Sequence, residues 1–235
     1  MRPGNIILYT LIAAAAVACD DGRIYDDAAQ AGGGEATATV RFSGRVAGLD
    51  SWTGGYTVAV AGFGDSDYAE VAKAVTAGEL EMGGITGDIR SVELCVINRL
   101  RKRVATFASV GTAKGSDGYI HLDAGDVDAG MYAAVQTAVF DAACVQCHGG
   151  SNHSAASLNL TAPGSREALV DCGSVKEPGM MRVVPGDASA SVLWRALATD
   201  MSDDWAYRHH TIISNTTSVS LVKDWIDAGA KTDLP

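Results

Sequence analysis

The 235-residue sequence contains few aromatic residues and few positive charges. Aromatic side chains make up 6% of it, and 18 lysines and arginines stand against 28 aspartates and glutamates, which gives a net charge of −10. A nucleic-acid partner needs a basic face for its phosphates, so this balance argues against nucleic-acid binding. The sequence also lacks a glycine-rich phosphate-binding loop followed by Lys-Ser/Thr, and nothing in it marks an activated nucleophile.

The N-terminus has the composition of an export signal. Arg2 is followed by an apolar run, 6–17, which is too short to span a bilayer comfortably, and small residues then lead into Cys19. The run Ala16-Val17-Ala18-Cys19 resembles the lipobox of bacterial lipoproteins, whose cysteine is acylated and becomes the new N-terminus. We therefore expect 1–18 to be a lipoprotein signal peptide and Cys19 to anchor an exported protein that faces the periplasm or the cell surface. Cleavage of a plain secretory signal near Ala18 is the alternative.

Two regions of different composition follow the signal. Residues 19–35 are acidic and then rich in alanine and glycine, which cannot bury a core, so we expect a flexible tether. Residues 36–126 are predicted to form a β-sandwich-like domain, because apolar and polar residues alternate along several short runs. The expected strands are 38–43, 56–63, 92–97, 104–110 and 119–122. A helical insertion is expected at 66–77, where apolar residues recur at helical spacing.

From about residue 127 the pattern changes to helix. Apolar side chains recur at every fourth position from Met131 to Ala143. Further helices are expected at 165–170, from 187 or 189 to 197, and from 216 or 217 to 229. We therefore predict an all-α domain over 127–235, and for the whole chain an α+β, two-domain fold.

The run Cys144-Val145-Gln146-Cys147-His148 is the attachment sequence for c-type haem. Two intervening residues make about one helical turn, which places both thiols along the haem edge, and the adjacent histidine then points at the iron. A redox dithiol or half of a zinc site are the alternatives, but a thioredoxin-like βαβ unit and two nearby zinc ligands are not evident. The motif occurs once, so we expect one covalent haem c, held by Cys144 and Cys147 and ligated by His148.

Residues 131–235 resemble a class I-type cytochrome c domain, particularly the variety appended to bacterial exported and lipid-anchored proteins. The resemblance rests on the haem motif with its following Gly149-Gly150, and on Leu158-Asn159-Leu160, Val183-Val184-Pro185-Gly186-Asp187, Ser191-Val192-Leu193 and Asp224-Trp225-Ile226-Asp227-Ala228-Gly229-Ala230. It implies an all-α cytochrome c-like domain after the β-sandwich. It further implies that the helix before the haem motif packs on the terminal helix and that Trp194 and Trp225 help to bury the porphyrin, unless both are simply core residues.

The second iron ligand is the point at which this sequence departs from that family. Related domains carry a methionine upstream of the terminal Trp-Ile pair, but this chain has Tyr207-Arg208-His209-His210 there. Our leading hypothesis is His209 as the distal ligand, followed by His210, then Met201, and then Met180 or Met181. Imidazole in place of methionine lowers the reduction potential. A five-coordinate iron is the remaining alternative.

These features predict an electron carrier rather than an enzyme, with a redox protein as partner and the membrane reached through the lipid anchor. A surface lipoprotein that binds a ligand or protein and carries an accessory haem domain is one alternative, with Trp52 and Tyr56 as candidate glycan contacts. An open-site haem enzyme or sensor is another. The basic run 99–103 is either a docking patch for an acidic partner or a solvated hairpin end. Cys95 and Cys172 either form a disulfide, which export permits, or remain as buried thiols.

Overall fold

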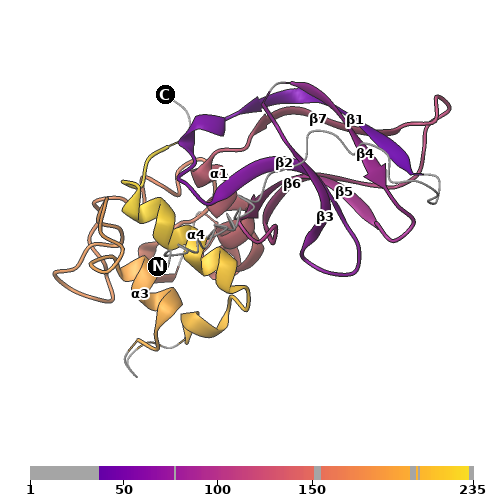
Figure 1. Cartoon of the computed structure of the whole chain (residues 1–235). Coiled ribbons are helices and arrows are strands. Elements are labelled where there is room, and N and C mark those ends of the chain that lie inside the picture. Colours follow the sequence, from indigo (N-terminus) through magenta and orange to yellow (C-terminus); the bar gives the residue numbers. More distant parts are fainter. Residues whose placement is uncertain (1–36, 77, 151–154, 202–204, 206, 233–235) are drawn as a thin grey trace, which may run out of the picture.

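The computed structural model of the chain describes residues 37–76, 78–150, 155–201, 205 and 207–232. Seven strands form two sheets within this part of the chain, and the helices gather beside one end of them (Figure 1). The predicted signal peptide, Cys19 and the tether lie outside the described residues. Among the helices that are described, none has the length and apolar character needed to cross a membrane.

The three-stranded sheet has the order β4-β1-β7 and pairs segments that are far apart in the sequence. Strand β1 (Ala38–Ala47) runs antiparallel to β4 (Glu79–Ile85) and parallel to β7 (Ile120–Asp128). Alternate side chains of β1 are buried, and Val40 and Phe42 face the core. This sheet therefore follows the period of two that the sequence of β1 shows.

The four-stranded sheet has the order β3-β2-β5-β6, and all its neighbouring strands are antiparallel. Its strands are β2 (Tyr56–Phe63), β3 (Ala69–Ala74), β5 (Ser91–Asn98) and β6 (Arg103–Gly111). The sheet is curved, so that its edge strand β3 approaches the start of β6. The Ala69 amide of β3 donates a hydrogen bond to the carbonyl of Arg101, in the turn before β6 (2.9 Å). A second, small cluster of buried residues packs together in this sheet, formed by Ala59, Ala61, Phe63, Ala69, Ala72, Cys95 and Ile97.

Most of the predicted strands are confirmed. The runs at 38–43, 56–63, 92–97 and 104–110 lie in β1, β2, β5 and β6, and the run at 119–122 starts β7. The predicted helix at 66–77 is wrong, because this segment contains strand β3, whose pairing with β2 outweighs the local helical spacing. Strand β4 is not evident from the sequence, since Gly83 and Gly84 interrupt its alternation.

The helical elements are short apart from one continuous run and the last helix. The run consists of α1 (Met131–Val135), a π-helical stretch η2 (Gln136–Cys144) and α2 (Val145–His148). Helix α3 (Val192–Ala198) and helix α4 (Thr216–Asp227) follow. Single 3-10 turns are η1 (Leu49–Ser51), η3 (Ala155–Ser157) and η4 (His209–Thr211).

Helix α4 forms as its sequence predicts. Asn215 caps it, since the Asn215 side chain accepts a hydrogen bond from the Thr217 amide (3.0 Å). Leu221, Val222, Trp225 and Ile226 are buried on one face.

The sheets and the helices share one continuous hydrophobic core. Polar contacts reinforce the junction: the Trp52 indole N–H donates to the Ala129 carbonyl (2.8 Å), and the Tyr56 hydroxyl donates to Asp224 Oδ2 (2.6 Å). Burial, together with the Asp224 carboxylate, raises the pKa of Tyr56. Trp52 and Tyr56, considered above as glycan contacts, therefore have their polar atoms engaged in this junction.

The expected fold class, a β-sandwich followed by an all-α cytochrome c-like domain, is wrong. The described chain is mostly β, with seven strands in two sheets and only short helices, and no all-α domain is seen in it. The expected helix at 165–170 consists of turns, and the chain between η3 and α3 is largely irregular. Prolines at 163, 178 and 185 and the glycines near them disfavour helix there, so Leu160, Leu169 and Val183 are buried from turns instead.

Candidate functional site

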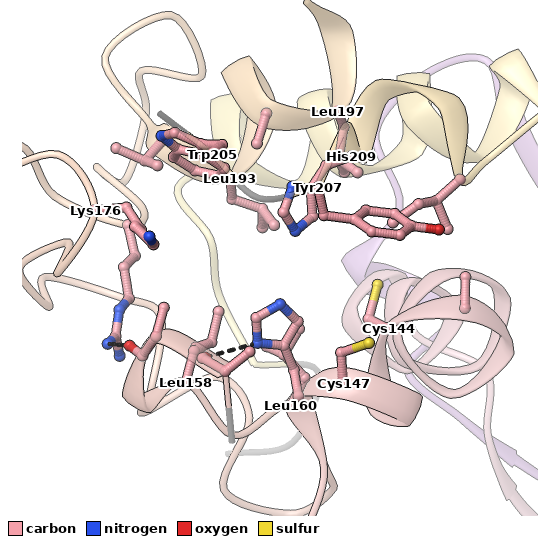
Figure 2. A pocket seen from close by; sticks show the side chains of 18 of the residues that line it. Cys144, Cys147, Leu158, Leu160, Lys176, Leu193, Leu197, Trp205, Tyr207 and His209 are labelled. Carbon is pink, nitrogen blue, oxygen red and sulfur yellow. Dashed lines mark hydrogen bonds between the residues drawn. The ribbon is translucent and has the colours of Figure 1, made fainter. Parts of the chain in front are cut away.

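A cavity of about 470 Å³ lies between the motif helix, the irregular chain after it, α3 and the segment before α4 (Figure 2). This volume is within the range of small-molecule and cofactor sites, about 300–1,000 Å³. Most of the wall is apolar, with leucines at positions 158, 160, 169, 193 and 197. A few polar groups converge on this apolar surface, and the haem motif supplies several of them.

Both cysteines of the motif lie on the cavity wall. Figure 2 shows the Cys144 and Cys147 sulfurs beside each other, at the end of the helical run. Both are free thiols in this structure. Burial, and to a lesser extent the neighbouring Cys147, raises the pKa of Cys144 to about 11. A redox-active Cys-x-x-Cys pair has a lowered thiol pKa, so this environment argues against the dithiol alternative.

His148 follows the cysteines, and a hydrogen bond to a backbone carbonyl orients its ring. Its Nδ1 lies 3.0 Å from the Ala155 carbonyl oxygen, which can only accept, so Nδ1 carries the proton and donates. This contact leaves the other ring nitrogen, Nε2, as the atom that could bind a metal, and such a second-shell contact is typical of metal-ligating histidines. The helix ends at Gly149, whose backbone is extended, and only glycine fits there because a Cβ would lie 2.4 Å from the Val145 carbonyl oxygen.

His209 lies across the cavity from the motif, on turn η4 (Figure 2). The His148 and His209 ring centroids are 6.0 Å apart, with 32° between the ring planes. Two imidazoles that bind one metal ion from opposite sides, at metal–nitrogen distances of about 2.0–2.1 Å, have ring centroids about 6 Å apart. The pair therefore has the separation that one iron between them requires.

Two aromatic side chains hold the distal imidazole. The rings of Trp205 and Tyr207 contact His209 edge-on, at centroid distances of 5.3 and 5.8 Å. Trp205 is itself fixed, because its indole N–H donates to Glu177 Oε1 (2.9 Å). Burial and the nearby His148 lower the pKa of His209, which favours the neutral imidazole that binds metals. Neither aromatic residue was singled out by its spacing, although both flank the predicted ligand.

The other predicted distal ligands do not line the cavity. His210 Nδ1 lies 3.8 Å from Asp200 Oδ1. The Met180 sulfur accepts a hydrogen bond from the Arg195 guanidinium (2.8 Å), and Met181 is 43% exposed. Met201 is also absent from the wall. Of the candidates named from the sequence, only His209 faces His148.

The remaining expectations concern two tryptophans and two cysteines. Trp194 and Trp225 do not line the cavity and pack in or against the hydrophobic core, which favours the alternative that both are core residues. Trp225 is instead a core residue that packs on Tyr132 (ring centroids 5.0 Å apart). Cys95 and Cys172 are free thiols rather than a disulfide, and burial raises the pKa of Cys95.

Three comparisons, with protein families, with curated proteins and with solved structures, find no match. Within the described residues, no group of three or more histidine, cysteine, aspartate or glutamate side chains is arranged to hold a bare metal ion. A two-imidazole site in an apolar cavity is different, because a porphyrin supplies the other four iron ligands. The side chains present therefore fit haem better than zinc.

Proposed function

We propose that this protein is an exported, lipid-anchored monohaem c-type electron carrier whose iron has two histidine ligands. The observation that carries the proposal is the placement of His209 opposite His148, 6.0 Å between ring centroids, across a cavity that also exposes Cys144 and Cys147. The two thiols and two imidazoles that such a site would use line one cavity. The proposal concerns the site, and it does not require the all-α fold that the structure contradicts.

Cys144 and Cys147 would hold the cofactor covalently. Each thiol would supply the sulfur of one thioether link, by addition of its S–H to a vinyl side chain of the haem. The addition is redox-neutral and needs no oxidant. Covalent attachment prevents dissociation, and the apolar leucine wall would exclude water from the bound group.

His148 and His209 would ligate the iron through their unprotonated nitrogens. When bound, haem supplies reversible one-electron exchange between its ferric and ferrous states. The two imidazoles would fix a lower potential than a histidine–methionine pair does, and six-coordination would leave no open position for a substrate. These properties favour an electron carrier over an oxygen-activating enzyme.

The proposed location follows from the N-terminal sequence. Residues 1–18 would direct export and Cys19 would carry the lipid, which fits a c-type haem because that group is attached outside the cytoplasm. The tether at 19–35 would separate the folded part from the membrane. The redox partner would then be a protein on the same side of that membrane.

The ligand pair can be tested by near-infrared magnetic circular dichroism of the oxidised protein, produced with a c-type maturation system. The expected spectrum has the charge-transfer band of a low-spin bis-histidine haem. A methionine–iron band would exclude His209 as the ligand, and a high-spin spectrum would indicate an open position. Carbon monoxide is the second probe: the reduced protein is expected to bind it slowly and incompletely, whereas fast, complete binding would favour the sensor or enzyme alternative.

A further inference from the structure

The turn between β5 and β6 is a rigid, positively charged projection on an acidic protein. It consists of Arg99, Leu100, Arg101 and Lys102, which we call the basic turn. The Asn98 side-chain oxygen accepts hydrogen bonds from the Leu100 amide (2.9 Å) and the Lys102 amide (3.0 Å), so the turn has a defined shape. Its backbone is therefore preorganised rather than free to collapse onto a neighbour.

Within the described part of the chain, the cations of this turn lack acidic partners. No described residue forms an ion pair with Arg99, Arg101 or Lys102, whereas the adjacent Arg103 is paired with Asp67 (3.0 Å) and Glu93 (2.9 Å). The whole chain carries a net charge of −10, so three unpaired cations in four positions are an exception to its surface. Such a local potential steers charged partners even when the net charge has the opposite sign.

Exposed apolar side chains accompany these charges. Leu100 is 72% exposed at the tip of the basic turn, and Tyr68, which forms a β-bridge with Lys102, is 48% exposed. Both are among the few large apolar residues that the described surface exposes to this degree. Exposed large apolar side chains next to arginines are the composition of a protein–protein contact rather than of a merely solvated turn.

The basic turn also lies at the haem end of the molecule. Arg103, directly after it, lines a groove of about 430 Å³ between β6, the π-helical stretch and the start of α4. This groove shares Ala142, Ala143, Ile212 and Ile213 with the cavity that contains the haem motif. A partner seated on the basic turn and across the groove would thus lie against the wall that separates it from the proposed haem.

We propose that the basic turn, with Tyr68, is the docking surface for an acidic redox protein. The inference rests on the proposed function, since it names the partner of the same haem. Charge complementarity selects an acidic partner, and Leu100 and Tyr68 supply the apolar contact. The negative remainder of the surface repels that partner elsewhere, so the encounter is directed to the haem end.

Ferricyanide tests the local charge. It accepts one electron from the ferrous protein, giving ferric protein and ferrocyanide. The rate constant is expected to fall as ionic strength rises, because salt screens the attraction to the basic turn. The net charge of −10 alone predicts the reverse, and a rate that rises with salt would overturn the proposal.

Two charge-reversal variants, one in the basic turn and one outside it, distinguish local charge from net charge. Arg101→Glu should slow the low-salt reaction by about tenfold or more. Lys114→Glu changes the net charge equally, but it lies on the loop after β6, at the end opposite the basic turn, and should have little effect. Equal slowing by both variants would show that only net charge matters and would reject the docking surface.

Binding of poly-L-glutamate gives a readout that does not need haem. The wild-type protein should bind this acidic polymer at low salt, and Arg101→Glu, but not Lys114→Glu, should lose the binding. Absence of haem after maturation would contradict the proposed function, but the binding of poly-L-glutamate could still be measured. Conversely, a haem-loaded protein that does not bind poly-L-glutamate would contradict only the proposed docking surface.

Anionic phosphatidylglycerol vesicles are the competing probe, applied to a Cys19→Ser form that lacks the predicted lipid. No Arg101-dependent binding is expected, because the proposal assigns this surface to a protein. Vesicle capture that Arg101→Glu abolishes would assign the basic turn to a lipid headgroup instead and overturn the proposal.

Discussion

Gln136 is the hub of a buried polar network under the proposed haem site, and its removal should be among the costliest single changes in the chain. Its side-chain nitrogen donates to Asp141 Oδ1 (2.6 Å) and to the Leu160 carbonyl (3.0 Å). Its oxygen accepts from the Ser165 hydroxyl (2.6 Å), which also contacts the Tyr132 hydroxyl (2.5 Å). The network ties the start of the π-helical stretch to the turn that carries Leu160 on the cavity wall.

The size of the effect follows from what Gln136→Leu leaves behind. Ser165 is fully buried and Leu160 is 2% exposed, so water cannot replace the lost partners of the hydroxyl and the carbonyl. Each unsatisfied buried group costs about 1–3 kcal/mol, so we expect a loss of roughly 2–5 kcal/mol in the free energy of unfolding. Tyr132→Phe removes one hydrogen bond and keeps the ring, and should cost only about 1 kcal/mol.

Urea unfolding followed by tryptophan fluorescence measures both variants and their combination. Because Ser165 joins the two side chains, the double variant should lose less stability than the sum of the single changes. A cost below about 0.5 kcal/mol for Gln136→Leu would contradict this network, since surface substitutions usually stay within that range. Full additivity would show that the hydrogen bonds do not form one network.

Three further outcomes are expected. His209→Ala should open the distal position, so that the reduced protein binds carbon monoxide rapidly, whereas His210→Ala on the same turn should leave binding unchanged; equal behaviour would contradict the ligand assignment. Trp205→Phe, which loses the hydrogen bond to Glu177, should loosen His209 and speed carbon monoxide binding to a smaller extent, and an unaltered rate would remove Trp205 from this role. Burial raises the pKa of Tyr132 to about 12, from about 10 when unfolded, so the stability it contributes is complete below pH 10 and is lost as the pH rises towards 12. Alkaline unfolding scans should show this loss, and Tyr132→Phe should reduce it.

The strands with strong local signals were predictable from the sequence, and those defined by distant pairing were not. Strand β5 contains a continuous apolar run, which is typical of a strand buried on both faces. Strand β3 depends on pairing with β2, and the apolar spacing of its short sequence fits a helix equally well. The parallel pairing of β1 with β7 has no local signature, because it joins segments separated by most of the β half.

In the candidate site, too, some residues were predictable from the sequence and others were not. The Cys-x-x-Cys-His spacing was enough to propose Cys144, Cys147 and His148 as haem-binding candidates, because the spacing is itself the signal. The choice between His209 and His210 depends on which way two adjacent side chains point from a 3-10 turn, and no sequence pattern encodes that. The chain between η3 and α3 was misjudged for another reason: it buries single apolar residues through turns, so helical periodicity does not describe it.

The proposed function depends on covalent binding of one haem through Cys144 and Cys147. Intact-mass spectrometry of protein matured with a c-type system, combined with a pyridine haemochrome spectrum, tests it most directly. We expect a mass gain of one haem and the spectrum of two thioether links, both lost when Cys144 and Cys147 are replaced by alanine. A colourless wild-type protein with the mass of the bare polypeptide would contradict it.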